Sequence, residues 1–187
     1  MATGPGQVQL VADTAVQQQP IRLDLCLPVA APSKVSSMPH LLERSTWIAR
    51  PLAEVFDFFA DAGNLERITP PELRFRILSP LPIDMRRGAT IEYRLALFGV
   101  PFSWLTMIDQ WEPPYRFVDR QLRGPYAQWV HTHMFRCERD GTRMDDRVEY
   151  RLPLDPLGLP ALPLVRHQLR RIFDYREMTI QRLLVEG

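Results

Sequence analysis

Two histidines separated by one residue, His131 and His133, are the side chains of this sequence best suited to chemistry. Alternate residues of a strand point to the same side, so the two imidazoles would lie side by side between Trp129 and Phe135. An imidazole titrates near neutral pH and is also a common metal ligand. The pair could therefore move protons, bind a metal ion or anchor a ligand.

Three interpretations of His131 and His133 stay open. As a metal pair they would need a third ligand, which Asp119 or Asp146 could supply. As acid–base groups in a cyclisation or dehydration they would be assisted by Tyr150 or Asp119. As polar anchors of a ligand site, or as core histidines with satisfied hydrogen bonds, they would do no chemistry. We favour this last interpretation and assign no catalytic residue, metal or cofactor.

The turn at Asp140-Gly141 predicts which way the histidines point, because this dipeptide favours a two-residue hairpin loop. The predicted register places His131 opposite Tyr150 and His133 opposite Val148. The face of the hairpin that holds both histidines is the more apolar of the two. We therefore expect this face to be covered by a helix.

The loop at Gly124-Pro125 is longer and leaves two registers open for the strand before it. One register places Asp119 beside His131, where the carboxylate would favour the charged imidazole. The neighbouring register places Val118 there instead. The loop alone does not decide between these two arrangements.

The inward surface mixes aromatic rings with polar groups. A turn at Gly99 adds Trp104, opposite Leu95, and Tyr93, opposite Thr106. Buried polar groups need partners, and a packed core normally uses aliphatic side chains, so the mixture favours a cavity with a polar floor. The residues expected to bind a ligand there are Tyr93, Trp104, Asp119, Gln121, Trp129, His131, His133 and Tyr150.

Prolines and glycines mark the elements that must position these residues. A strand is expected within residues 40–50, an amphipathic helix from Pro51 to about Asp61, and a second short helix at Leu65–Ile68. Six more strands are expected at residues 73–78, 90–98, 103–111, 115–121, 128–135 and 144–152. Short hairpin connections between successive strands predict an antiparallel sheet.

The last segment is expected to be one long helix. No glycine or proline interrupts it between Pro163 and Gly187, and an apolar stripe follows helical spacing. It would have about 22 residues and a length of about 33 Å. A run of strands with the helices set apart predicts an α+β fold, in which the long helix covers one face of the sheet.

Several segments together resemble the SRPBCC superfamily, which includes START domains, the birch pollen allergen and polyketide cyclases. The resemblance, strongest to bacterial ligand-binding proteins of the cyclase/dehydrase type, is carried by Phe56, Leu65–Pro71, Gly124–Phe135, Asp146–Leu154, Leu157-Gly158 and Ile172–Arg176. It implies a helix-grip fold, with a seven-stranded antiparallel sheet curved around the long C-terminal helix and one or two short helices after the first strand. Coenzyme Q-binding relatives and aromatic polyketide cyclases share this architecture, so the resemblance leaves the function open.

Composition limits the partners. The chain has 187 residues, 45% of them hydrophobic, which suits one domain with a real core. With 23 basic and 22 acidic residues its net charge is +1, and no nucleic-acid partner is expected. No apolar run approaches the roughly 20 residues that cross a bilayer. Two distant cysteines and the absence of a signal-peptide pattern favour the cytoplasm.

Residues 1–39 are expected to be a disordered tail, and residues 40–187 a START-like ligand-binding domain. The expected function is to bind or carry a small hydrophobic or amphipathic ligand, such as a lipid, a quinone or a polyketide-like aromatic. One alternative is an aromatase/cyclase- or dehydrase-type enzyme that uses His131 and His133. Another is a protein-interaction module that acts through the tail. Peripheral membrane contact through the arginine-rich face of the last helix also stays open.

Overall fold

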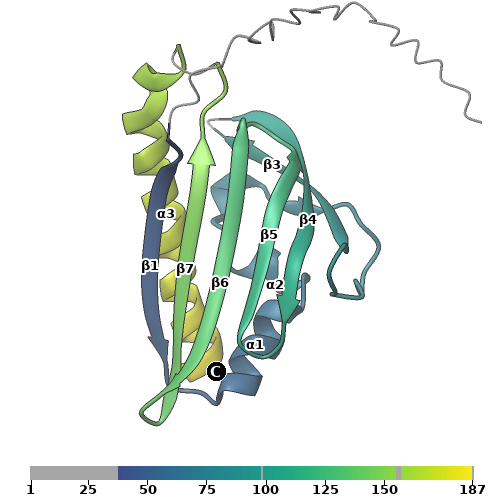
Figure 1. Cartoon of the computed structure of the whole chain (residues 1–187), viewed down its shortest axis with the longest axis vertical. Coiled ribbons are helices and arrows are strands. Elements are labelled where there is room, and N and C mark those ends of the chain that lie inside the picture. Colours follow the sequence, from purple (N-terminus) through teal and green to yellow (C-terminus); the bar gives the residue numbers. More distant parts are fainter. Residues whose placement is uncertain (1–37, 98, 155–156, 187) are drawn as a thin grey trace, which may run out of the picture. The chain divides into compact units, whose positions relative to one another are not determined.

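A computed structural model describes residues 38–97, 99–154 and 157–186. Seven antiparallel strands form one sheet in the order β1-β7-β6-β5-β4-β3-β2 (Figure 1). The strands are β1 (His40–Ile48), β2 (Arg76–Ile77), β3 (Thr90–Leu97), β4 (Val100–Glu112), β5 (Arg116–Arg123), β6 (Gln128–Glu138) and β7 (Gly141–Arg151). The predicted seven-stranded antiparallel sheet is confirmed. The expected tail falls almost wholly on residues 1–37, which lie outside the described residues.

The helices flank the strands at both ends of the chain. They are α1 (Leu52–Ala60), α2 (Asn64–Arg67), the 3-10 turns η1 (Pro71–Leu73) and η2 (Leu159–Ala161), α3 (Leu162–Gln181) and the π-helical turn η3 (Arg182–Glu186). Figure 1 shows α3 behind the sheet, running along β1 and β7. The long final helix and the two short helices after the first strand are as predicted. No helix within the described part of the chain is both long and apolar enough to cross a membrane.

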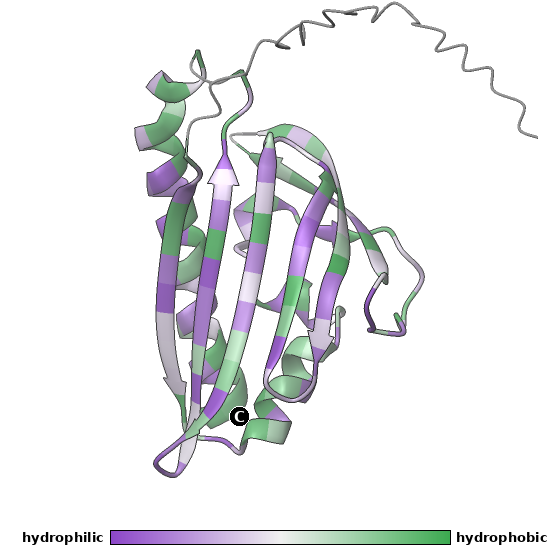
Figure 2. Ribbon diagram, viewed as in Figure 1, coloured by the Kyte–Doolittle hydropathy of each residue, from purple (hydrophilic) through white to green (hydrophobic). Residues whose placement is uncertain are grey.

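Alternation along the strands separates a covered face from an exposed one. Figure 2 shows hydrophilic and hydrophobic bands following one another along β6 and β7. The inner residues of these strands are buried under α1 and α3. From α1, Val55, Phe56 and Phe59 pack against Phe135 and Met144 of the β6–β7 hairpin. Burying each such large side chain contributes roughly 1.5–3 kcal/mol, so this cluster fixes α1 on the sheet.

A second core cluster fixes α3. Leu169 and Phe173 from the helix pack with Val148, Tyr150 and Leu152, which come from β7 and the residue after it. The spacing of four between Leu169 and Phe173 places both on one helix face. The apolar stripe predicted from the sequence therefore meets the inner face of the sheet.

The β6–β7 turn lies one residue earlier than predicted, which shifts the register of the two strands by two residues. Glu138 pairs with Gly141, so the turn consists of Arg139 and Asp140, and Arg139 takes a left-handed backbone with φ +57°. Gly141 instead begins β7, where a Cβ atom would collide with the carbonyl oxygen of Ile48. The glycine is thus explained by close approach of β1 to β7 and not by the turn.

This two-residue shift keeps every side chain on its predicted face, because a strand has period two. The partners across the strands change: His131 faces Val148 instead of Tyr150, and His133 faces Asp146 instead of Val148. Both histidines are 5% exposed, so the prediction that they point inward is confirmed. The change of partner places a carboxylate directly opposite one imidazole.

The other two predicted turns have different outcomes. The β3–β4 register is also shifted by two residues, so Tyr93 faces Trp104 instead of Thr106. Between β5 and β6, Asp119 pairs with His131, which is the first of the two registers considered. The sheet therefore places one acidic residue on each side of the histidine strand.

One predicted strand is much shorter in the structure, and one cysteine lies outside the core. The strand expected at residues 73–78 is reduced to Arg76 and Ile77, because Pro71–Leu73 forms a 3-10 turn that ends in a left-handed residue. Cys137 is exposed near the tip of the β6–β7 hairpin. The hairpin extends beyond the core at that point, so the inward face there meets solvent.

Candidate functional site

A cavity of about 150 Å³ lies between the inner face of β3–β6, α3 and the residues around α2. Most of its wall is apolar or aromatic. Of the eight residues predicted to bind a ligand, six line it: Tyr93, Trp104, Asp119, Trp129, His131 and His133. The structure thus brings together side chains from four strands that are well separated in the sequence.

Gln121 and Tyr150, the other two predicted residues, lie outside the cavity lining. The Gln121 side chain donates a hydrogen bond to the carbonyl oxygen of Tyr126 at 2.7 Å and accepts one from the Tyr126 backbone N–H at 3.3 Å. Gln121 therefore closes the loop between β5 and β6. Tyr150 is 1% exposed and packs in the core beside Leu169, because the register shift moves it one pair away from the histidines.

Three aromatic rings form one wall of the cavity. Tyr93 stacks on Trp104 with ring centroids 5.8 Å apart, and Trp129 meets Trp104 edge-on at 5.3 Å. The Trp104 indole N–H is buried and has no hydrogen-bond partner among the described residues. A buried donor without a partner is unfavourable, so this N–H is a point of the aromatic wall where a hydrogen-bond acceptor would be favoured.

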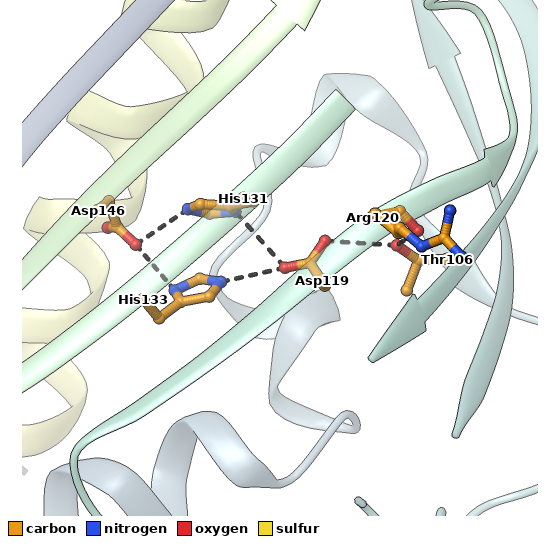
Figure 3. Close-up of polar contacts among 6 residues, drawn as sticks. All are labelled: Thr106, Asp119, Arg120, His131, His133 and Asp146. Atoms are coloured by element: carbon orange, nitrogen blue, oxygen red, sulfur yellow. Dashed lines mark hydrogen bonds and ion pairs between the residues drawn. The ribbon is translucent and has the colours of Figure 1, made fainter. Parts of the chain in front are cut away.

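The polar end of the cavity is a cluster of two carboxylates and two imidazoles on three adjacent strands (Figure 3). Asp146 Oδ1 on β7 lies 3.0 Å from His131 Nε2 and 2.8 Å from His133 Nδ1. Asp119 Oδ2 on β5 lies 3.2 Å from His133 Nε2 and 3.8 Å from His131 Nδ1. Each imidazole therefore lies between the two carboxylates, with one ring nitrogen directed toward each.

Burial makes these contacts strong. The side chains of His131, His133 and Asp146 are each 6% exposed, and that of Asp119 is 17% exposed. Charges interact more strongly in such an environment than in water. The four side chains consequently behave as one titrating unit.

The pKa shifts follow from this environment. Burial alone would raise the pKa of Asp146, but the hydrogen bond from His131 and the adjacent charge of His133 outweigh it and hold this pKa well below 3.8. Burial, together with the neighbouring His133, lowers the pKa of His131. The pKa of His133 is raised, because its contacts with Asp119 and Asp146 outweigh its burial. His133 therefore holds its proton more tightly than His131 does.

Two further residues, Thr106 and Arg176, lie at the site. Neither was predicted as a site residue from the sequence. The Thr106 hydroxyl donates a hydrogen bond to Asp119 Oδ1 at 3.3 Å. Arg176 from α3 lines the cavity, with its guanidinium 5.1 Å from the centre of the Phe173 ring. Its Nε is buried and has no hydrogen-bond partner among the described residues. The signal for Arg176 was its position three residues after Phe173, on the same helix face.

Comparisons with known proteins agree with the fold. No family model matches the chain. No curated protein matches it either. Among solved structures, the Zhui aromatase/cyclase from Streptomyces sp. R1128 has a TM-score of 0.63 and 15% identity, covering 80% of this chain and 98% of that one. Protein CV1439 from Chromobacterium violaceum has a TM-score of 0.62 and 14% identity, covering 78% of this chain and 98% of that one.

A third solved structure is matched over part of its length. The chain covers 28% of the nucleoside-diphosphate sugar epimerase from Corynebacterium glutamicum, with 75% of its own residues, 25% identity and a TM-score of 0.53. These similarities agree with the fold that the sequence predicted: the chain has a helix-grip fold, with a seven-stranded antiparallel sheet and a long C-terminal helix. The fold is shared by proteins of different activity, so function must be argued from the cavity.

Proposed function

We propose that the protein binds a small hydrophobic or amphipathic molecule in the cavity and carries it without changing it chemically. The observation that carries this proposal is the buried, unpartnered indole N–H of Trp104 in the aromatic wall. An oxygen atom of a ligand would accept this hydrogen bond and remove a penalty of about 1–3 kcal/mol. The rest of the wall would bury the ligand's apolar surface.

The size of the cavity narrows the class of ligand. A cavity of about 150 Å³ accommodates one benzene-sized ring. This favours a quinone head group or a polyketide-like aromatic ring over a lipid with long acyl chains. The ligand we infer is therefore a single aromatic or quinonoid ring that carries at least one oxygen acceptor.

Tryptophan fluorescence tests the proposal directly, because Trp104 and Trp129 both line the cavity. The probes are tetramethylbenzoquinone and 4-hydroxybenzoate. We expect saturable quenching with one ligand per chain. Ala62→Leu would extend a side chain into the cavity from a buried lining position and should weaken binding at least about tenfold. Ala127→Leu adds the same atoms at an exposed site and should leave binding unchanged.

Two outcomes would count against the proposal. One is equal binding by the wild type and Ala62→Leu when both are shown to be folded by circular dichroism. The other is the absence of any saturable quenching together with an empty cavity in native mass spectra of protein purified from its own host. Either result would show that the protein has this fold but does not carry a ligand in this cavity.

A second candidate function is catalysis of the aromatase/cyclase or dehydrase kind. The observation that favours it is the buried pair His131 and His133 at the polar end of the cavity, where each imidazole lies beside two carboxylates. Such a pair can accept a proton at one site and donate one at the other. Replacing both histidines by Gln should then abolish turnover of a polyketide-like substrate in a folded protein. Unchanged turnover in that double variant would exclude this role.

A further inference from the structure

We propose that Asp119, His131 and His133 bind a divalent transition-metal ion, and that Asp146 orients both imidazoles toward it. The proposal does not depend on the aromatic ligand, since all four groups belong to the chain itself. It rests on which nitrogen of each imidazole is directed toward which carboxylate. The geometry separates a ligand side, at Asp119, from a supporting side, at Asp146 (Figure 3).

The ligand side has the spacing that one ion requires. One ligand atom from each of Asp119, His131 and His133 lies within 4.8 Å of the other two. Asp119 Oδ2 lies 3.2 Å from His133 Nε2 and 3.8 Å from His131 Nδ1. Two atoms bound to the same ion at about 2.0–2.2 Å are about 3–3.6 Å apart at octahedral or tetrahedral angles. Shifts of a few tenths of an ångström would therefore place an ion between all three.

Hydrogen bonding alone does not account for this arrangement. The distance of 3.8 Å between His131 Nδ1 and Asp119 Oδ2 is too long for a hydrogen bond. The two imidazole centroids are nevertheless only 3.8 Å apart, so both rings are held with their near nitrogens beside the same carboxylate oxygen. A single cation shared by the three groups would explain why they converge.

The supporting side has the features of an outer carboxylate. Histidine ligands usually donate their second ring N–H to a carboxylate, which fixes the tautomer and the orientation of the ring. Asp146 Oδ1 shares a hydrogen bond with His131 Nε2 at 3.0 Å and lies 2.8 Å from His133 Nδ1, where the angle does not yet meet hydrogen-bond geometry and a small ring rotation would correct it. One buried oxygen thus lies within reach of the second nitrogen of both imidazoles. Asp146 is not among the residues that line the cavity, whereas the three proposed ligands are.

Charge and ligand type define the ion. The two carboxylates carry two negative charges in a buried site, and a divalent cation would neutralise both. Two imidazoles with one carboxylate suit Zn²⁺, Fe²⁺, Co²⁺ or Ni²⁺, whereas Mg²⁺ and Ca²⁺ prefer sites built from oxygen ligands. Three protein ligands leave at least one coordination position free. Because those ligands line the cavity, the free position would face the space that a ligand can enter.

The experiment is metal titration of the full chain after any affinity tag is removed and the protein is treated with a chelator. Isothermal titration with Zn²⁺ should give one ion per chain, and Co²⁺ should produce a visible absorption spectrum typical of nitrogen and oxygen ligands. Mg²⁺ should give neither signal. X-ray absorption of the Co²⁺-loaded wild type should show two imidazoles bound, a result that requires no variant to fold.

Variants then assign the site. Asp119→Asn and His133→Gln should each weaken Zn²⁺ binding more than about 100-fold. Asp146→Asn should weaken it about 10–100-fold without changing the stoichiometry, as expected for a supporting carboxylate. His167→Gln, an exposed histidine on α3, is the matched control and should bind as the wild type does.

Three results would overturn the proposal. These are no saturable binding of Zn²⁺ or Co²⁺ by folded wild type, absorption data without two imidazoles, and equal loss of binding in His167→Gln and His133→Gln. All measurements are made without an organic ligand. A failure here would therefore leave the fluorescence test of ligand carriage unaffected, and a failure there would leave the metal site intact.

Discussion

Asp119 Oδ2 lies 3.2 Å from His133 Nε2, although Asp119 is the register partner of His131. The carboxylate thus makes its shorter contact along a diagonal of the sheet, where side chains two residues apart on a neighbouring strand still meet. Asp146 on β7 is the register partner of His133. Its Oδ1 also lies 3.0 Å from Nε2 of His131, the diagonal neighbour. Three adjacent strands are therefore connected by one buried polar cluster.

Removing one member of this cluster should be costly in the metal-free protein. Asp146→Asn removes the buried negative charge that lies beside both imidazoles, and we expect a loss of about 3–5 kcal/mol in the free energy of unfolding. Asp145→Asn is the control. Asp145 directly precedes Asp146 on β7, points to the other face of the sheet and forms an ion pair with Arg136 at the surface. Such surface pairs contribute about 0–1 kcal/mol. Urea denaturation of the chelator-treated variants measures both losses of unfolding free energy. Equal losses in Asp146→Asn and Asp145→Asn would contradict a buried cluster at Asp146.

The effect of Asp146→Asn should depend on pH in a definite direction. The folded pKa of Asp146 lies below its ordinary value of 3.8, so its carboxylate contributes stability that is present above pH 3.8. That contribution is lost as the pH falls below 3.8 toward the folded pKa, by about 1.4 kcal/mol per pH unit. The difference between wild type and Asp146→Asn should therefore be smaller at pH 2.5 than at pH 7. A constant difference would show that folding does not lower the pKa of this carboxyl group.

The fold was predictable because its signals are local and repeated. Period-two alternation in the strands and the apolar stripe of the last helix set the inward face of each element. The registers were harder, since the glycine used to place the β6–β7 turn serves a contact with Ile48 in a distant strand. A two-residue error keeps the face correct and changes only the partner.

That change of partner explains which residues of the site could be predicted from the sequence and which could not. His131 and His133 were placed on the correct face, but Tyr150 was assigned to them and Asp146 was considered only as one of two metal ligands. The position of Gln121 depended on a loop whose backbone it holds, which no spacing rule predicts. Arg176 was missed because an arginine on an arginine-rich helix is normally solvated.

The indole N–H of Trp104 should affect binding more than stability. Trp104→Phe removes a donor that has no partner in the described structure, so the relief of that penalty offsets the packing that is lost. We expect stability within about 1.5 kcal/mol of wild type and about tenfold weaker binding of 4-hydroxybenzoate. Trp47→Phe should instead lower stability and leave binding unchanged, because the Trp47 N–H donates a hydrogen bond to the Glu138 carbonyl oxygen. Fluorescence and thermal unfolding separate the two cases, and equal affinity in Trp104→Phe would remove its proposed role.

Close approach at Gly141 predicts a specific steric defect. A Cβ atom there would overlap the carbonyl oxygen of Ile48 and lie 3.0 Å from the Trp47 ring. Because a backbone atom cannot move aside easily, Gly141→Ala should lower the free energy of unfolding by about 1–3 kcal/mol. At Gly63 the nearest atom is instead the flexible side chain of Asp61, so Gly63→Ala should change stability by less than about 1 kcal/mol. Denaturant unfolding of both variants is the measurement, and a stable Gly141→Ala would contradict the β1–β7 packing.

The guanidinium of Arg176 should select the charge of the ligand. It lines the cavity and stacks on Phe173, and its positive charge adds to the larger effects of His133 and His131, which outweigh burial and lower the pKa of Asp119. Arg176→Met keeps an unbranched stem against Phe173 but removes that charge. We expect binding of anionic 4-hydroxybenzoate to weaken about tenfold, because a charge-assisted contact is lost, while neutral tetramethylbenzoquinone binds as before.

Arg170→Met controls for a general change in surface charge, since Arg170 is exposed on the same helix. It should leave both affinities within about twofold of the wild type, because exposed charges at a distance are screened by salt. If Arg176→Met weakened both probes equally, the side chain would act by packing and not by charge. If neither affinity changed, Arg176 would lie outside the binding site. Any tighter binding of the anionic probe would then have to come from the Trp104 N–H or from an ion held by Asp119 and the two histidines.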